Sequence, residues 1–253
     1  MTDARNRFSD RVANYIRFRP GYPSELVSAL LTRAESGDEP VVADIGSGTG
    51  IFTGLLLDRG LRVYAIEPNA NMRAAAEECL ANYKRLVSID GDAENTGLAD
   101  ASVDLVTAAQ AFHWFNNEQS RAEFARILKP AGSLALIWNK RRLEQPFQQA
   151  YDALLREIAP EYGKVNHMNL SSAHIAEFFA AGSMETLHFD NQQQLDFDSL
   201  LGRLKSSSYC PGEGSEPYAR LIDGLRRLFD KHATNDLLAF EYDTQLYHGP
   251  VAR

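Results

Sequence analysis

Cysteine is scarce in this sequence. Cys79 and Cys210 are the only two among 253 residues, and they stand far apart without the spacing of metal ligands. Small domains held together by disulfides, and cysteine-based zinc sites, need several closely spaced cysteines. We therefore expect two reduced thiols, no metal site and a protein from a reducing compartment.

Long apolar runs are also missing. No stretch approaches the roughly 20 apolar residues that a membrane-spanning helix needs, and the N-terminal sequence MTDARNRFSDR is charged from its third residue. This start does not resemble a secretory signal, whose apolar region follows a short basic segment. We expect a soluble, cytoplasmic protein without a membrane partner.

The chain has no excess of positive charge and no internal repeat. Its 26 basic and 34 acidic residues give a net charge of −8, so a nucleic-acid backbone would be repelled on average. The 44% hydrophobic content over 253 residues is enough for one large domain. These features favour a small-molecule substrate over nucleic acid and leave the oligomeric state open.

A strand, a glycine loop, a helix and a second strand are predicted in residues 41–67. Residues 41–45 are apolar on both faces, as expected of a central parallel strand. Glycines at alternate positions then let the backbone turn sharply and approach a ligand: Gly46, Gly48 and Gly50. The helix expected at residues 51–59 points its first amide groups back at this loop.

The third glycine of a dinucleotide-binding fingerprint is missing. The pattern G-x-G-x-x-G would require it where Ile51 or Thr53 stands. Glu67 nevertheless follows the strand expected at residues 61–66. In nucleotide-binding folds, an acid at this place binds the ribose hydroxyls. The segment therefore predicts a ligand that carries a ribose without being a dinucleotide.

Two motifs carry a family resemblance. The sequence DIGSGTG after the first strand resembles the first motif of class I methyltransferases that depend on S-adenosyl-L-methionine (SAM), and RILKPAGSL at residues 126–134 is similar to the same family. The resemblance covers residues 41–139 in order and points to the methyltransferase type 11 group. It implies an α/β fold, a doubly wound, Rossmann-like sheet of seven strands with the last one antiparallel, together with a helical N-terminal lid and a cap.

The resemblance implies SAM as the cofactor and S-adenosyl-L-homocysteine (SAH) as the product. Asp92, just past a third strand, suits the adenine amino group, although Asp also occurs in ordinary turns. Met72 could pack on the adenine face, although a methionine at helical spacing is more often part of the core. The predicted cofactor-binding residues are Arg19, Asp44, Gly46, Ser47, Gly48, Gly50, Glu67, Pro68, Met72, Asp92, Ala93, Ala109 and Gln110.

The N-terminal segment is similar to the pattern Y-x-x-x-R-P-x-Y-P, which in many relatives folds over the cofactor. Its matches include Tyr15, Arg19 and Tyr22. If the role carries over, Arg19 pairs with the methionine carboxylate and a tyrosine face lies near the sulfonium. The alternative is a solvated arginine beside packing tyrosines.

The segment AQAFHWF, residues 109–115, follows the fourth strand and should face the reacting centre, because ligands bind outside the carboxyl ends of such strands. His113 is the candidate catalytic residue, as a base or as a hydrogen-bond donor to substrate. A histidine that caps a helix or is satisfied in the core is the alternative. The segment is similar to that of relatives that act on small acids, such as trans-aconitate methyltransferases. The predicted substrate-binding residues are Tyr15, Tyr22, Trp114, Arg141 and Tyr209.

We expect one methyltransferase domain over residues 1–253. Its predicted parts are a lid with the first helices (1–40), a SAM-binding core (41–139), a helical cap (140–182) and a return to the sheet (183–253). The pattern predicts a fifth strand at 134–138 in the core. Within the last two parts it predicts helices at 146–158, 171–180, 197–205 and 216–232, and strands at 184–189 and 238–247.

Methyl transfer to an oxygen of a small molecule, a carboxylate or a hydroxyl, is the predicted function. Two alternatives stay open at this point. One is a non-catalytic SAM-binding module that regulates a partner, and the other is an NAD(P)-dependent oxidoreductase on a similar sheet, which the missing glycine disfavours.

Overall fold

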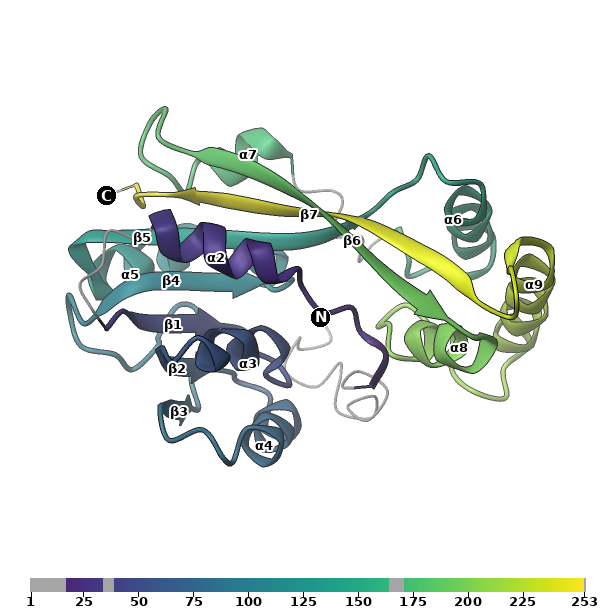
Figure 1. Ribbon diagram of the computed structural model, residues 1–253, viewed down its shortest axis with the longest axis horizontal. Coiled ribbons are helices and arrows are strands. Elements are labelled where there is room, and N and C mark those ends of the chain that lie inside the picture. Colours follow the sequence, from purple (N-terminus) through teal and green to yellow (C-terminus); the bar gives the residue numbers. More distant parts are fainter. Residues whose placement is uncertain (1–16, 34–38, 164–170, 253) are drawn as a thin grey trace.

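The computed structural model describes residues 17–33, 39–163 and 171–252 (Figure 1). Its centre is a seven-stranded sheet in the order β3-β2-β1-β4-β5-β7-β6. The first five strands are parallel, and β7 runs antiparallel to both of its neighbours. The strands are β1 Val41–Ile45, β2 Arg62–Ile66, β3 Leu86–Ile89, β4 Val103–Ala109, β5 Leu128–Arg141, β6 Glu185–Leu195 and β7 Leu238–Gly249. This confirms the predicted fold, including its antiparallel last strand.

Helices cover both faces of the parallel strands, so their side chains are buried on either side. Leu26, Leu30 and Leu56 of α2 and α3 pack with Val42 and Val63 in one apolar cluster. A second cluster on the sheet takes in residues of α5 and α7. The helices are α2 Ser24–Arg33, α3 Ile51–Asp58, α4 Ala70–Cys79, α5 Glu118–Ile127, α6 Pro146–Ile158, α7 Ser172–Ala176, α8 Phe197–Lys205 and α9 Glu216–His232, with a short 3₁₀ helix, Phe112–Trp114.

Strands β6 and β7 extend beyond the parallel strands and carry a separate helical layer (Figure 1). There α6, α8 and α9 pack around the last residues of β6 and the first of β7, with Tyr151, Leu200, Leu225 and Phe240 fully buried. Ile175 of α7 is instead buried in the cluster on the parallel part of the sheet. The predicted cap, residues 140–182, therefore contains one helix of this layer and one helix of the core.

The sheet strands that differ most from prediction are β5 and β6. The pattern predicts strands at 134–138 and 184–189, and both are longer in the structure. The end of β6, NQQQL, has weak strand propensity. It pairs with β7 along its whole length, and this pairing between distant segments overrides the local preference.

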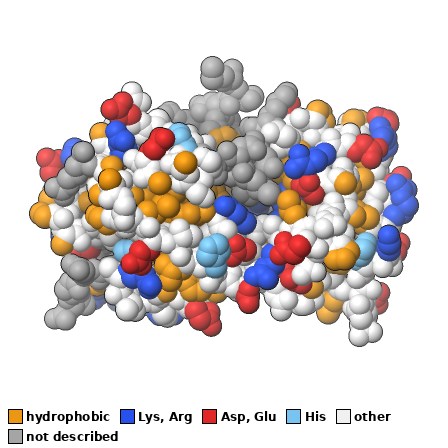
Figure 2. All heavy atoms as spheres, turned by 90° about the horizontal axis from the view of Figure 1, so that it is seen from above, with side chains coloured by type: hydrophobic (Ala, Val, Ile, Leu, Met, Phe, Trp, Pro, Cys, Tyr) orange, Lys and Arg blue, Asp and Glu red, His pale blue; other side chains and the backbone are white. Residues whose placement is uncertain are grey.

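The surface carries both signs of charge. On the face drawn in Figure 2, Lys and Arg side chains are interspersed with Asp and Glu. Within the described residues, no helix is long and apolar enough to cross a bilayer. Cys79 is exposed and Cys210 is buried, and no disulfide joins them.

Candidate functional site

A cavity of about 260 Å³ opens at the carboxyl ends of β1, β2 and β4 and reaches the helical layer beyond them. The two strands that flank its floor, β1 and β4, are the neighbours at which the strand order reverses, and ligands of open α/β sheets bind there. A smaller cavity of about 50 Å³ adjoins it along the β1–α3 loop. The larger cavity is lined by Arg19, Pro20, Gly46, Gly48, Glu67, Pro68, Asn69, Met72, Asp92, Ala93, Glu94, Ala109, Gln110, Ala111, His113, Trp114, Phe115, Asn139, Arg141, Arg203, Ser208, Tyr209 and Tyr242.

The β1–α3 loop needs its glycines for different reasons. Gly46 and Gly48 have φ of +66° and +59° and line both cavities, whereas Ser47 lines the smaller one. A Cβ at Gly46 would lie 2.7 Å from that of Ala111, so a side chain there would fill the floor. Gly50 lines neither cavity. A Cβ there would lie 2.7 Å from Leu80, and Gly50 therefore serves helix packing.

Glu67 ties this loop to the end of β2. Its carboxylate accepts hydrogen bonds from the backbone amides of Gly48 at 2.9 Å and Asn69 at 2.8 Å. Burial raises the pKa of the Glu67 carboxyl although both bonds oppose the shift. A carboxylate has about four lone-pair positions, so these two bonds leave acceptor capacity for ligand hydroxyls.

Asp44 lies at the end of β1, 1% exposed, and lines the smaller cavity. Its two oxygens accept hydrogen bonds from the hydroxyls of Thr53, at 2.6 Å, and Thr107, at 2.8 Å. Burial raises the pKa of this carboxyl to about 6, against the effect of the two hydroxyls. The group is thus poised to change its charge just below neutral pH.

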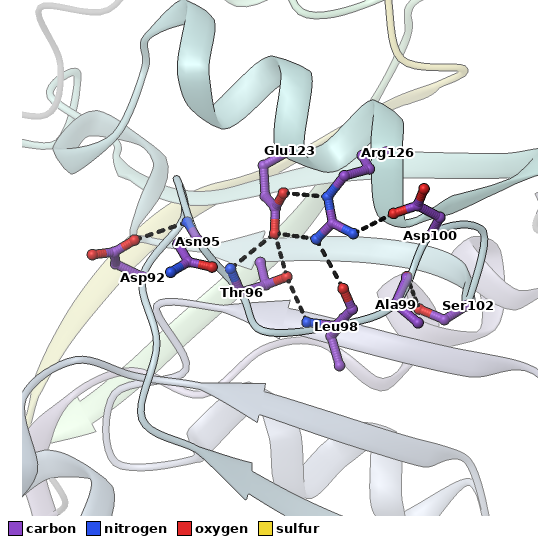
Figure 3. A network of polar contacts seen from close by, with 9 residues as sticks. All are labelled: Asp92, Asn95, Thr96, Leu98, Ala99, Asp100, Ser102, Glu123 and Arg126. Carbon is purple, nitrogen blue, oxygen red and sulfur yellow. Dashed lines mark hydrogen bonds and ion pairs between the residues drawn. The ribbon is translucent and has the colours of Figure 1, made fainter.

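The connection from β3 to β4, which carries Asp92 and Ala93, is held by polar contacts to α5 (Figure 3). Asp92 accepts a hydrogen bond from the amide of Asn95 at 2.9 Å. Glu123 then accepts bonds from both the amide and the hydroxyl of Thr96, and it pairs with Arg126 at 2.7 Å. The loop at the cavity wall is therefore fixed by contacts to a neighbouring helix.

Met72 and Pro68 line the wall beside the glycine loop. The side chain of Asn69 caps α4 by accepting bonds from the amides of Asn71 and Met72, and this fixes where the helix begins. The sulfur of Met72 lies 3.9 Å from the position of a Cβ on Gly48. Met72 thus faces the glycine loop across the cavity.

The end of β4 contributes Ala109, Gln110, His113 and Trp114 to the cavity. Gln110 has φ of +58°, a conformation that costs energy for a residue with a side chain. Phe112 is fully buried against Phe178 instead. Burial, and secondarily the charge of Arg19, lower the pKa of His113 to about 4, so its imidazole is neutral at physiological pH.

Three described residues of the predicted N-terminal lid reach the site, namely Arg19, Pro20 and Tyr22. Arg19 lines both cavities and donates a hydrogen bond to the carbonyl of Ser206 at 3.1 Å. Tyr22 lines the smaller cavity only and packs edge-on against Phe52. Tyr15 lies outside the described residues.

The helical layer supplies the opposite wall. Arg141 ends β5 and Tyr209 follows α8, and both of these predicted substrate-binding residues line the cavity. Arg203 of α8 and Tyr242 of β7 line it too, and the sequence reasoning missed both. For Arg203 a signal exists, because it stands one turn from Leu200 on the apolar side of its helix, where a cation is unusual.

Comparison with known proteins identifies the family to which this chain belongs. Residues 43–136 match the family model described as a methyltransferase domain. An uncharacterized methyltransferase of Mycobacterium tuberculosis (strain ATCC 25618 / H37Rv) is 31% identical over 248 residues, which cover 97% of this chain and 96% of that protein. The chain belongs to the class I SAM-dependent methyltransferases. An uncharacterized methyltransferase of Schizosaccharomyces pombe is 26% identical to this methyltransferase over 95% of both chains.

Solved structures share the fold of this methyltransferase. A protein of Anaeromyxobacter dehalogenans, provisionally named a type II methyltransferase, aligns with a TM-score of 0.73 at 24% identity, over 92% of this chain and 98% of that one. The Haemonchus contortus phosphoethanolamine N-methyltransferase 2, solved in complex with SAM, aligns with a TM-score of 0.57 at 15% identity. That alignment covers 97% of this chain and 57% of the other.

The residues at the cavity suit the cofactor of a SAM-dependent methyltransferase. The loop presents backbone without side chains to the cavity at Gly46 and Gly48, and Glu67 keeps acceptor capacity beside it. Asp44 adds a carboxylate that a cationic group would favour in its charged form. A cofactor with a ribose and cationic centres matches these three features.

Proposed function

We propose that this methyltransferase methylates an oxygen of a small organic acid, a carboxylate oxygen in preference to a hydroxyl. The observation that carries the proposal is the environment of His113, which lines the cavity, is half-buried and has a pKa lowered to about 4 by the loss of solvation. A base so weak gives little help in removing a proton from a hydroxyl or an ammonium group. A carboxylate needs no such help, since it is already ionised.

Methyl transfer mainly requires that the acceptor oxygen be aligned with the methyl group. When bound, SAM supplies a methyl group already activated by the positive sulfur. The protein then has to hold the acceptor oxygen in line and keep water out, and ideal positioning contributes up to about 7–11 kcal/mol to lowering the barrier. A general base would add about 10²- to 10⁴-fold in rate. We assign His113 and Trp114 to holding the acceptor, together with Arg141 and Tyr209.

The similarity of AQAFHWF to the matching segment of trans-aconitate methyltransferases supports the same acceptor class. On the cofactor side, we assign the ribose to Glu67, the methionine carboxylate to Arg19 and the adenine to Asp92 with Ala93. The positions of these residues around one continuous cavity support the assignment.

Calorimetric titration with SAM, SAH and NADH tests the cofactor half of the proposal. We expect micromolar binding of SAM or SAH, none of NADH, and weaker binding by Glu67→Ala than by Glu78→Ala, a control at an exposed acid of α4. The acceptor half is tested by SAH release with a panel of carboxylic acids, alcohols and amines. Turnover confined to amines would contradict it.

A further inference from the structure

Two arginines are buried together in the wall that the helical layer contributes to the cavity. Arg141, the last residue of β5, is 6% exposed, and Arg203 of α8 is 5% exposed. Both line the cavity. Guanidinium groups stay protonated in proteins, so two full positive charges lie in a region largely removed from water.

The protein supplies too little negative charge to match them. The carboxylate nearest Arg141 is that of Asp152, 4.0 Å away, and it is shared with the exposed Arg156, at 2.6 Å, and with the phenol of Tyr162. Within the described ranges no carboxylate lies within 4.0 Å of Arg203. The carboxylate of Asp152 is therefore shared by the guanidinium groups of Arg141 and Arg156. Arg203 has no carboxylate partner among the described residues.

The contacts of Arg203 are instead with neutral groups. Its Nε donates to the hydroxyl of Tyr242 at 2.7 Å, and its guanidinium carbon lies 3.9 Å from the centre of the Phe240 ring. An aromatic face attracts a cation without neutralising it. This arrangement holds the guanidinium plane in place while its charge remains available to a ligand.

Arg141 has a donor that the protein leaves unused. Its Nη1 is buried without a hydrogen-bond partner in the part of the chain that the structure describes, while Nη2 donates to Tyr162. A buried donor without an acceptor destabilises the folded state, and more so when it is charged. Most buried polar groups are satisfied, so an unsatisfied guanidinium nitrogen in a cavity wall indicates a missing acceptor.

The phenol of Tyr209 reports the same positive field. Burial alone would raise its pKa, but the charges of Arg141, Arg203 and Arg19, together with a hydrogen bond with Ser207, bring the pKa below the ordinary value. Tyr209 also lines the cavity, its ring edge-on to that of Tyr162. A negative group placed here would meet two guanidinium groups and at least one phenol.

We propose that Arg141 and Arg203 form a binding site for an oxyanion, a carboxylate or a phosphate, that belongs to the methyl acceptor. Its assignment to the acceptor rests on the proposed function, because the other end of the same cavity holds the residues assigned to the cofactor. Planar guanidinium groups bind oxyanions through paired N–H donors, and burial strengthens each such bond. Arg203 is thus a specificity-determining residue.

Thermal unfolding of the protein without cofactor tests this site independently of methyl transfer. Succinate, inorganic phosphate and the neutral diamide succinamide are titrated separately at constant ionic strength. We expect the melting temperature to rise with succinate or phosphate and to stay constant with succinamide. A rise with succinate alone assigns a carboxylate to the site, and a rise with phosphate alone assigns a phosphate.

The variants identify where the anion binds. Arg203→Met should shift the half-maximal anion concentration upward by about tenfold or more, as expected for losing charged hydrogen bonds. Arg203→Lys keeps the charge, provides a second readout if the Met variant fails to fold, and should shift it less. Arg226→Met is the matched control, since Arg226 stacks on the Phe197 ring on an exposed part of the same layer.

Two results would overturn the site. One is a melting temperature that no anion raises in the wild type. The other is an anion response in both Arg203 variants equal to that of the wild type. Absence of SAM binding together with a positive anion titration would instead contradict the proposed function and leave the oxyanion site standing.

Discussion

The carboxylate of Glu67 accepts a hydrogen bond from the backbone amide of Gly48 at 2.9 Å, so a side chain at the end of β2 holds the loop that follows β1. Its second oxygen accepts from Asn69 at 2.8 Å and fixes the start of α4. One residue thus shapes the glycine loop, the next helix and the wall of the cavity between them.

Replacing Glu67 with Gln should weaken SAM binding by about 10- to 100-fold and lower the melting temperature. A glutamine has one acceptor oxygen in place of two, so one of the two buried amides loses its partner, which costs about 1–3 kcal/mol. Calorimetry and thermal unfolding measure the two effects. Glu78→Gln is the control, and equal SAM affinity in both variants would exclude a ribose-binding role for Glu67.

Replacing Gly202 with Ala should weaken SAM binding and lower the free energy of unfolding by at most about 2 kcal/mol. A Cβ at Gly202 would lie 2.2 Å from the Phe18 ring, so the segment that carries Arg19 must shift. Overpacking costs about 1–3 kcal/mol, and the better helix propensity of Ala returns about 1 kcal/mol. Gly212→Ala, where a Cβ meets nothing within 4 Å, is the control. Unchanged affinity for SAM in Gly202→Ala would remove Arg19 from the cofactor site.

SAM affinity should fall as the pH drops below 6. Asp44 has a pKa of about 6 in the folded protein, against 3.8 for a free carboxyl, so it is charged above pH 6 and becomes neutral below it. If the charged form binds the cationic cofactor, affinity is constant above pH 6 and falls about tenfold per pH unit below. Calorimetry at pH 7.5 and pH 5 measures this, and Asp44→Asn should remove the difference.

The Asp44 carboxyl also makes the free energy of unfolding depend on pH. Because the folded state binds the Asp44 proton more tightly than the unfolded state, its contribution to stability declines as the pH rises from about 4 to 6 and is constant above. The free energy of unfolding of Asp44→Asn minus that of the wild type should therefore increase as the pH rises from about 4 to 6. A flat difference would show that Asp44 has an ordinary pKa.

Replacing His113 with Gln should lower the methyl-transfer rate by less than about tenfold, since loss of a general base would lower it by about 10²- to 10⁴-fold. With a pKa of about 4, His113 is neutral throughout the range from pH 5.5 to 8. Its titration should therefore cause no change in the methyl-transfer rate over that range. The rate and its pH profile are measured with SAM saturating. Near-complete loss with intact SAM binding would make His113 a base instead.

The cofactor side of the cavity could be predicted because its signals are local. Gly46 and Glu67 directly follow β1 and β2, Asp92 lies three residues after the end of β3, and parallel strands end at the same edge of the sheet. Their meeting in one cavity therefore follows from the order of strands. Gly50 belongs to the same motif but packs on Leu80, since a glycine pattern does not tell ligand approach from helix packing.

The wall from the helical layer could be predicted only in part, because it depends on pairing between distant segments. Arg141 was named as an arginine that could hold a carboxylate acceptor. Arg203 and Tyr242 reach the cavity because β6 and β7 pair over their full lengths and carry α8 with them. The polar run at residues 191–194 gives no local sign of that extension.

Strand β7 belongs to both halves of the molecule, with Tyr247 in the cluster on the parallel strands and Phe240 in the outer cluster. The two halves are therefore joined by backbone hydrogen bonds, which are indifferent to side-chain identity. In evolutionary terms, residues of α6, α8 and α9 can be exchanged to suit a new acceptor while the ladder keeps its register. Acceptor preference can diverge among descendants of this chain without rebuilding the part that binds the methyl donor.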